Sequence, residues 1–179
     1  MNIQQPSLTS KIETSRKSLI AIMHTDPFGM LQYIGPEFVQ LAQRPAEKFL
    51  ECHLAHLISR QVPRVITDAL YLNMSQGKSF SGFFLLKNDS DTPCWAFISI
   101  TPEYEQEQLT GFCLICRYVP VAIRQKIQPL YQQLLMLENN GGTLASHFHI
   151  QSWMAQKGQD LSQVMRRIFQ EKNHELLTA

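Results

Sequence analysis

The chain has no excess of charge of either sign. It carries 16 Lys and Arg residues against 15 Asp and Glu residues, a formal net charge of +1 over 179 residues. Proteins that bind nucleic acids or anionic membrane surfaces usually concentrate basic side chains, so this balance argues against both kinds of partner. The sequence also lacks an apolar run near the ~20 residues of a membrane-spanning helix, and its polar start, MNIQQPSLTSK, is not a signal peptide. We therefore expect a cytoplasmic protein.

Patterns of residues that carry catalysis or bind metals are lacking as well. The sequence has no Ser-His-Asp set, no paired carboxylates and no glycine-rich phosphate loop, so we expect no enzymatic activity and assign no catalytic residues. Cys113 and Cys116 have C-x-x-C spacing, but a strand points positions three apart to opposite faces, and no second ligand pair follows. We therefore predict no metal site. All four cysteines lie in apolar runs and are interpreted as reduced, buried thiols: Cys52, Cys94, Cys113 and Cys116.

What the chain does have is enough apolar residues for a core. They make up 44% of the sequence, which argues against disorder. Domains commonly run to ~100–150 residues, so the length suits one domain plus an appendage. The character of the sequence changes after Pro120. We predict an N-terminal cap helix region at 1–18, the main domain at 19–120 and a C-terminal helical appendage at 121–179.

Five segments have the composition of strands. A turn sequence at Asp26–Gly29, with Pro at its second position, joins the first two segments into a hairpin. The last three are rich in aromatic and β-branched residues. Polar, turn-forming segments over 88–93 and 102–108 separate them, which favours an antiparallel meander. The predicted strands are Leu19–Met23, Met30–Ile34, Phe80–Lys87, Cys94–Thr101 and Leu109–Val119.

Helical patterns fill the space between the strands. Pro36 suits the first position of a helix, Arg44–Leu50 begins a second, and Val65–Met74 carries helical periodicity. Capping-box spacing at Ser10–Glu13 predicts a short N-terminal helix over 11–17. The order β-β-α-α-α-β-β-β predicts an α+β fold, a five-stranded antiparallel sheet with helices gathered on one side.

The region after Pro120 is predicted to be helical. Apolar residues recur there at alternating spacings of four and three from Ile123 to Leu137, as in a coiled-coil seam. Pro129 should kink this helix or delay its start, and Asn139–Gly142 should stop it. Two more helices are predicted to follow, over Thr143–Lys157 and over Leu161–Leu177, the second capped by Asp160 with Gln163.

Several short motifs follow one another along the chain at characteristic spacings. Gly77–Gly82 (GKSFSG) begins a strand, and twelve residues separate Gly82 from Trp95. The order and spacings resemble a PAS domain and, more narrowly, the PAS sensor domain of bacterial aerotaxis receptors, over roughly residues 12–137. The other motifs that carry the resemblance are the hairpin Asp26–Ile34 with Phe38 after it, Thr101-Pro102, Thr110-Gly111-Phe112, Arg117 to Pro120, and Leu130-Tyr131.

The resemblance implies a cupped sheet that, with its helices, encloses a small ligand. Aerotaxis-receptor PAS domains hold non-covalent FAD and report its redox state to a signalling partner. Their flavin site carries a segment like R-H-P-D-M-P, which aligns here with Ile58–Pro63 and replaces Arg, His and Asp by Ile58, Ser59 and Gln61. The family's Trp becomes Phe80. FAD is possible, but most of its motif is lost, so the cofactor is left open.

Aromatic residues could contact a ligand in such a cup. Trp95 and Phe97 alternate in one strand and share a face, which is either a filled sheet surface or, with Phe80, the lining of a pocket. The predicted ligand-binding set is Ile58, Ser59, Gln61, Phe80, Trp95 and Phe97.

Two other cofactor chemistries are disfavoured. Light-sensing PAS domains need a Cys in an N-C-R-F-L-like helix, and Cys52, the one cysteine in a predicted helix, lacks those neighbours. A haem-binding PAS domain would use a helical His as an axial ligand. His53 and His56 are instead interpreted as surface or capping residues.

The resemblance makes the leading hypothesis a sensory or regulatory module of bacterial signal transduction, as in chemotaxis. It would sense a small ligand or redox state and signal through the flanking helices, as a homodimer or with a signalling protein partner. The alternative is a ligand-free PAS scaffold for protein–protein association. A helix-turn-helix DNA reader at 143–177 is a third reading, but only Lys157, Arg166 and Arg167 precede its last turn.

Overall fold

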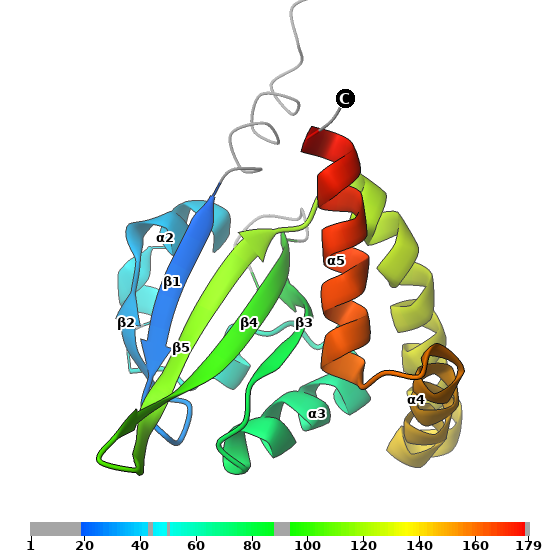
Figure 1. The fold of residues 1–179 in the computed structure, drawn as a ribbon, viewed down its shortest axis with the longest axis horizontal. Helices are drawn as coiled ribbons and strands as arrows, with labels where there is room; N and C mark the ends of the chain where they lie inside the picture. Colours follow the sequence, from blue (N-terminus) through cyan, green and yellow to red (C-terminus); the bar gives the residue numbers. More distant parts are fainter. Residues whose placement is uncertain (1–18, 43–44, 50, 88–93, 178–179) are drawn as a thin grey trace, which may run out of the picture.

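The computed structural model describes residues 19–42, 45–49, 51–87 and 94–177, with side chains as far as Glu171. Five strands form one antiparallel sheet in the order β2-β1-β5-β4-β3, as predicted (Figure 1). The predicted helix at residues 11–17 lies outside the described residues. The strands are β1 (Ile20–Thr25), β2 (Leu31–Ile34), β3 (Phe80–Leu86), β4 (Cys94–Glu105) and β5 (Gln108–Tyr118).

The predicted turn at Asp26–Gly29 is present, the turn predicted over 88–93 lies outside the described residues, and the third predicted turn needs a correction. Asp26 Oδ1 accepts hydrogen bonds from the backbone N–H groups of Phe28 and Met30, which fixes the β1–β2 turn. The segment from Pro102 to Gln108 was predicted to be a turn, but β4 and β5 extend through most of it. Only Gln106 and Glu107 form the turn, with φ angles of 47° and 67°. Two consecutive positive φ angles give a tight two-residue hairpin whose twist matches that of the strands.

Gly111 explains the Thr-Gly motif at the start of β5. A Cβ atom at this position would lie 2.1 Å from the backbone oxygen of Thr25, so only glycine lets β1 and β5 pair at this point. The neighbouring Thr110 donates its hydroxyl to the backbone oxygen of Glu103, at 3.1 Å. The motif thus holds three adjacent strands in register.

One face of the sheet, called the inner face, carries the helices between β2 and β3. They are α2 (Pro36–Ala42), the 3₁₀ turns η1 (Ala46–Lys48) and η2 (Leu54–His56), and α3 (Arg64–Ser75). The buried thiol of Cys94 donates to the backbone oxygen of Leu41 in α2, which joins the two layers. This confirms the prediction of helices gathered on one side.

The segment between α2 and α3 is less helical than predicted. Arg44–Leu50 was expected to begin a helix, but its described residues contain only η1, and residues 51–60 contain only η2. The backbone around Glu51 and Cys52 bonds to Leu31 on β2, and Glu51 has a positive φ of 60°. Pairing with the sheet edge therefore replaces the hydrogen bonds that an α-helix would make.

The opposite face, called the outer face, is covered over β3 and β4 by the C-terminal helices. These are α4 (Val121–Lys157) and α5 (Leu161–Leu177). The Phe169 ring of α5 stacks on Phe97, with centroids 4.3 Å apart and an interplanar angle of 7°. Tyr131 of α4 lies against Trp95, with centroids 5.4 Å apart. The predicted capping box at the start of α5 is confirmed, since Asp160 and Gln163 exchange backbone-to-side-chain hydrogen bonds.

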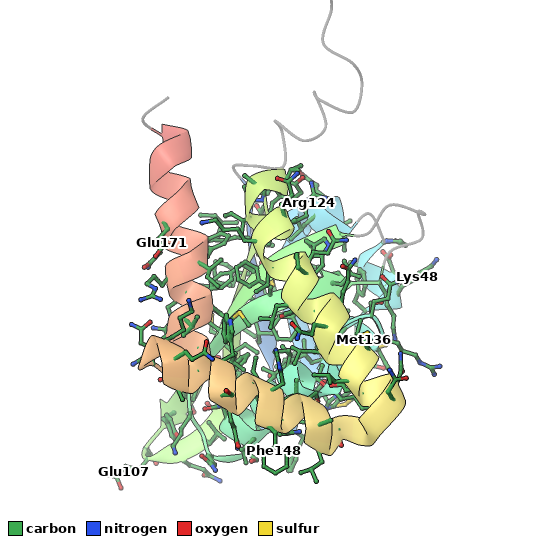
Figure 2. All side chains as sticks on the ribbon, turned by 90° about the vertical axis from the view of Figure 1, so that its right-hand side faces the viewer. Lys48, Glu107, Arg124, Met136, Phe148 and Glu171 are labelled. Carbon is green, nitrogen blue, oxygen red and sulfur yellow. The ribbon has the colours of Figure 1, made fainter. Side chains whose placement is uncertain are left out.

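Helix α4 changes direction near its middle (Figure 2). Gly142 has φ 74° and ψ 176°, which breaks the helix where Asn139–Gly142 was predicted to stop it. Pro129 lies inside the first half, and the helix begins before it, at Val121. No helix among the described residues is long and apolar enough to cross a membrane.

The edge of β3 that has no partner strand in the sheet is closed by hydrogen bonds from distant segments. Residues 57–59 pair with it, since Ser59 N–H donates to Leu85 O and Lys87 N–H donates to Leu57 O, both at 2.8 Å. The C-terminal helices close the rest: the Tyr131 hydroxyl donates to Phe83 O at 2.6 Å, and Ser81 N–H donates to the Ser162 hydroxyl at 2.9 Å.

The hydrophobic core continues from the sheet into both C-terminal helices. It includes Ile123, Ile127 and Leu134 of α4 together with Met165 and Phe169 of α5. The division of the chain at residues 18 and 120 stays a prediction.

Candidate functional site

Phe80, which the resemblance placed beside a ligand, packs in the core on the inner face. Phe80 is 1% exposed and its ring meets Phe84 edge to face, with centroids 6.4 Å apart. The two rings close over Gly82, where an added Cβ atom would lie 3.0 Å from Phe80. Phe80 is therefore a core residue in this conformation.

Trp95 and Phe97 lie on the other face from Phe80. Residues alternate between faces along a strand, and Phe97 pairs with Phe83, whereas Phe80 pairs with Ile100. The rings of Trp95 and Phe97 pack against α4 and α5. The three aromatic residues thus do not line one pocket.

Ile58, Ser59 and Gln61 lie beside the edge of β3. Ile58 is buried, and the Ser59 hydroxyl accepts a hydrogen bond from Gln61 N–H at 3.2 Å. Ile58 and Ser59 also line a groove, whereas Gln61 is exposed and does not line it. The structure therefore brings two of the six predicted ligand-binding residues together in a hollow.

This groove has a volume of about 1050 Å³ and separates two parts of the chain. One wall is the segment from η2 to α3, and the other is α4 on both sides of its kink. Three cationic side chains line it, while Glu138 is its one carboxylate. The lining residues used below are Ser59, Arg60, Arg64, Tyr71, Lys87 and Glu138.

Glu138 joins the two walls. Its carboxylate accepts hydrogen bonds from Arg64 N–H at 2.9 Å and Val65 N–H at 3.1 Å. Pro63, the N-cap residue of α3, makes no side-chain hydrogen bond to the helix. The Glu138 carboxylate from α4 therefore accepts from the free N–H groups, and its negative charge interacts favourably with the positive end of the helix dipole. The same carboxylate accepts from the hydroxyl of the fully buried Ser146, beyond the kink.

Tyr71 gives the groove a polar group without a protein partner. Its hydroxyl is buried and has no hydrogen bond to any other described residue. Burial raises the pKa of Tyr71 to about 12, so the hydroxyl stays neutral and can donate. A buried hydroxyl without a partner is costly, which suits a contact to a bound molecule or water.

Glu138→Ala is expected to lower the free energy of unfolding by about 1–2 kcal/mol, because two backbone N–H groups at the start of α3 lose their acceptor. Urea unfolding measures this loss. The control is Glu171→Ala on α5, whose exposed carboxylate pairs with Arg167 and should cost less than about 0.5 kcal/mol. Equal losses in both variants would contradict the capping role of Glu138.

Known proteins resemble this chain in its fold. No protein-family model and no curated protein matches the chain. Solved structures do match. One is a light-oxygen-voltage domain studied with a flavin analogue, with TM-score 0.56 and 12% identity over 74% of this chain and 98% of that one. The chain has a PAS-like fold. An RNA-binding light-oxygen-voltage receptor also matches, with TM-score 0.56 and 17% identity over 76% of this chain, which spans 40% of the receptor.

The residues of this PAS-like fold lack the charged and imidazole side chains that mark the flavin site of aerotaxis receptors, since Ile58, Ser59 and Gln61 stand at those positions. Ser59 N–H and Ile58 are also engaged in pairing with β3. Cys52 lies between the two 3₁₀ turns, with its thiol directed at Lys48 O at 3.7 Å. The cationic side chains of Arg60 and Lys87 line the groove.

Sequence reasoning missed most of the groove. Arg60, Tyr71, Lys87 and Glu138 lie in four different elements or connections, and no motif marks them. The one available signal was Pro63 directly before α3, which leaves the helix without a local side-chain cap.

Proposed function

We propose that this protein is a sensory or regulatory PAS-like module that binds a small anionic molecule in the groove. The observation that carries the proposal is the position of the groove, which lies between α3 and the kink of α4. Arg60, Arg64 and Lys87 supply positive charge and donors, and the Tyr71 hydroxyl supplies a neutral donor. Guanidinium groups bind carboxylates and phosphates through paired hydrogen bonds, which makes these the expected ligand groups.

Occupancy of the groove would be reported through α4. An anion beside Arg64 competes with the Glu138 carboxylate for the start of α3, and Glu138 also holds Ser146 beyond Gly142. A weakened Glu138 contact would change the bend of α4, so the two ends of the helix have different positions in the two states. Helix α5 follows the second half of α4 and would move with it.

The output would be a contact of the C-terminal helices with a homodimer partner or a signalling protein. Four large apolar side chains are exposed on α4, and Figure 2 labels two of them, Met136 and Phe148. The four are Val121, Met136, Leu144 and Phe148. The motif resemblance to aerotaxis-receptor sensors supports a role in bacterial signal transduction of this kind.

The ligand proposal is tested by calorimetric titration with citrate, pyrophosphate and AMP. At least one probe is expected to bind and to raise the melting temperature. Arg60→Ala and Lys87→Ala should each lower the affinity for that probe about tenfold, as loss of a charge-assisted hydrogen bond implies. Lys126→Ala, on an exposed part of α4 outside the groove, is the matched control. No binding of any probe, or equal weakening in the control, would refute the proposal. A flavin or haem absorption band in the purified protein would redirect it to redox sensing.

A ligand-free scaffold is the second candidate. The packing of Phe80 against Phe84 favours it, since two of the aromatic rings on the inner face contact each other in the core. Self-association in sedimentation, together with no response to the three anions, would select the scaffold.

A further inference from the structure

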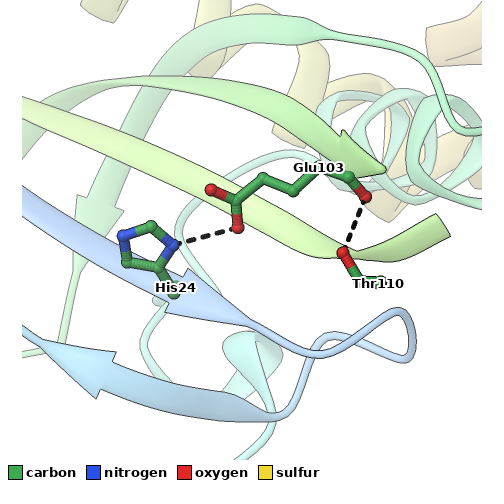
Figure 3. Close-up of polar contacts among 3 residues, drawn as sticks. All are labelled: His24, Glu103 and Thr110. Atoms are coloured by element: carbon green, nitrogen blue, oxygen red, sulfur yellow. Dashed lines mark hydrogen bonds and ion pairs between the residues drawn. The ribbon is translucent and has the colours of Figure 1, made fainter. Parts of the chain in front are cut away.

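We propose that His24, Glu103 and Cys113 form a binding site for a divalent transition metal, with Zn²⁺ as the expected ion. The three residues each offer one ligand atom, and these atoms all lie within 4.8 Å of one another. His24 Nδ1 is 3.0 Å from Glu103 Oε2 (Figure 3). This cluster shares no residue with the groove, so the proposal stands independently of the proposed function.

The sheet itself places the three side chains together. His24 on β1 pairs with Cys113 on β5, which pairs with Thr101 on β4, two residues before Glu103. All three ligands therefore point to the outer face, on adjacent strands about 4.8 Å apart. Beyond the part covered by α5, this face carries exposed side chains such as Ile22. A solute ion can thus reach the cluster.

The backbone is irregular directly beside two residues of the cluster, His24 and Glu103. The pairing shifts between His24 and Thr25 on β1, and again between Glu103 and Tyr104 on β4. Irregularities of this kind re-aim side chains and are frequent beside functional sites. The hydrogen bond from the Thr110 hydroxyl to the backbone oxygen of Glu103 holds the second shift in place (Figure 3).

The donor atoms suit zinc. An imidazole nitrogen, a carboxylate oxygen and a thiolate sulfur are its usual ligands, and three protein ligands leave the fourth tetrahedral position open to water or another molecule. Bond lengths of about 2.0–2.3 Å place donor atoms of a tetrahedral site roughly 3.3–3.8 Å apart. His24 Nδ1 and Glu103 Oε2, at 3.0 Å, must therefore move slightly apart, whereas the other separations, all within 4.8 Å, need to close by no more than about 1.5 Å.

Binding exchanges a proton for the metal. Burial, and then the charge of Glu103, raise the pKa of the Cys113 thiol, so it carries its proton in the metal-free protein. The S–H proton leaves to solvent as the S–metal bond forms. The ion takes the place of the His24–Glu103 hydrogen bond, so the proton that Nδ1 donates to Glu103 moves through solvent to Nε2 and leaves Nδ1 free to bind the ion. No oxidant or reductant takes part.

Cobalt titration of the full-length, reduced and chelator-treated protein tests the site. One equivalent of Co²⁺ is expected to produce the near-ultraviolet band of a thiolate-to-cobalt transition, and Zn²⁺ should remove it. Cys113→Ser should abolish the band. His24→Asn and Glu103→Gln should keep Cys113 as a ligand but lower the affinity for Zn²⁺ at least about tenfold, as measured by competition with a chromogenic chelator. Cys52→Ser is the matched control and should behave as the unaltered protein.

The outcomes separate cleanly. A band that survives Cys113→Ser, no band in the unaltered protein, or equal Zn²⁺ affinity in all variants would each refute the site. Circular dichroism checks that each variant is folded. Zn²⁺ is also expected to raise the melting temperature of the unaltered protein and not that of Cys113→Ser, and equal increases would count against the site.

Discussion

Replacement of Phe169 by alanine is expected to lower the free energy of unfolding by about 3–5 kcal/mol. The Phe169 ring is 4% exposed, stacks on Phe97 and lies 6.2 Å from the centroid of Phe83. Its removal leaves a cavity between α5 and the outer face, because these side chains come from three different elements and cannot all move inward. Denaturation by urea, followed by circular dichroism, measures the loss.

The control for Phe169→Ala is Phe148→Ala. Phe148 has the same side chain on α4 but is 64% exposed, so its loss should change stability by no more than about 0.5 kcal/mol. If both variants unfold at the same urea concentration, α5 does not stabilise the sheet. Hydrogen exchange distinguishes a local effect, since rapid exchange confined to α5 would indicate its release from a folded sheet.

Tyr131→Phe is expected to cost about 1–3 kcal/mol, because it leaves a buried backbone oxygen without a donor. The Tyr131 hydroxyl donates to Phe83 O at 2.6 Å, and the residue is 2% exposed. Tyr104→Phe is a close control. Tyr104 also donates to a backbone oxygen, that of Gly77, but is 52% exposed, so water can replace its hydroxyl. A larger loss in Tyr104→Phe than in Tyr131→Phe would contradict this account.

The unaltered protein and Tyr131→Phe are also expected to differ in alkaline solution. Burial raises the pKa of Tyr131 above the ordinary value of 10.0. Above that pH the unfolded chain releases the proton while the folded chain keeps it, so the stability of the unaltered protein should fall as pH rises. Tyr131→Phe should show a smaller fall. An identical pH dependence in both proteins would mean that the hydroxyl is not buried in solution.

The strands could be predicted because their pattern is local. Runs such as Phe80–Leu86 and Cys94–Glu105 are rich in β-branched and aromatic residues over a length that suits a strand. Their pairing register is not local. The placement of Phe97 opposite Phe83, rather than opposite Phe80, depends on how the two strands align. This alignment decides which aromatic residues face α4 and α5 and which face α2 and α3.

The segment between α2 and α3 was misjudged because tertiary pairing overrides local propensity there. Glu51 N–H donates to Leu31 O, and Leu31 N–H donates to Cys52 O. Nothing within residues 44–60 reveals that β2 would provide these partners. The wrong prediction of a helix was reasonable for the isolated segment and fails in the folded chain.

The groove and the three-ligand cluster depend on residues far apart in the sequence. Glu138 follows Arg64 by 74 residues, and Glu103 follows His24 by 79. A spacing rule detects ligands within one helix or turn, but sites assembled from separate strands leave no such spacing. Cys113 was correctly separated from Cys116 by strand alternation, but the prediction that it is buried is wrong, since it is half-buried on the outer face. Its neighbours could be found only from the order of strands in the sheet.

The closed edge of β3 has a consequence for how copies of this protein behave toward one another. A bare edge strand offers N–H and C=O groups to any extended chain, and long apolar edges promote aggregation. Here Tyr131 and Ser162 occupy two of those groups, and both belong to the C-terminal helices. A chain cut after Tyr118 would expose this edge together with Trp95 and Phe97. The helices thus keep a strongly apolar sheet from recruiting strands of other molecules.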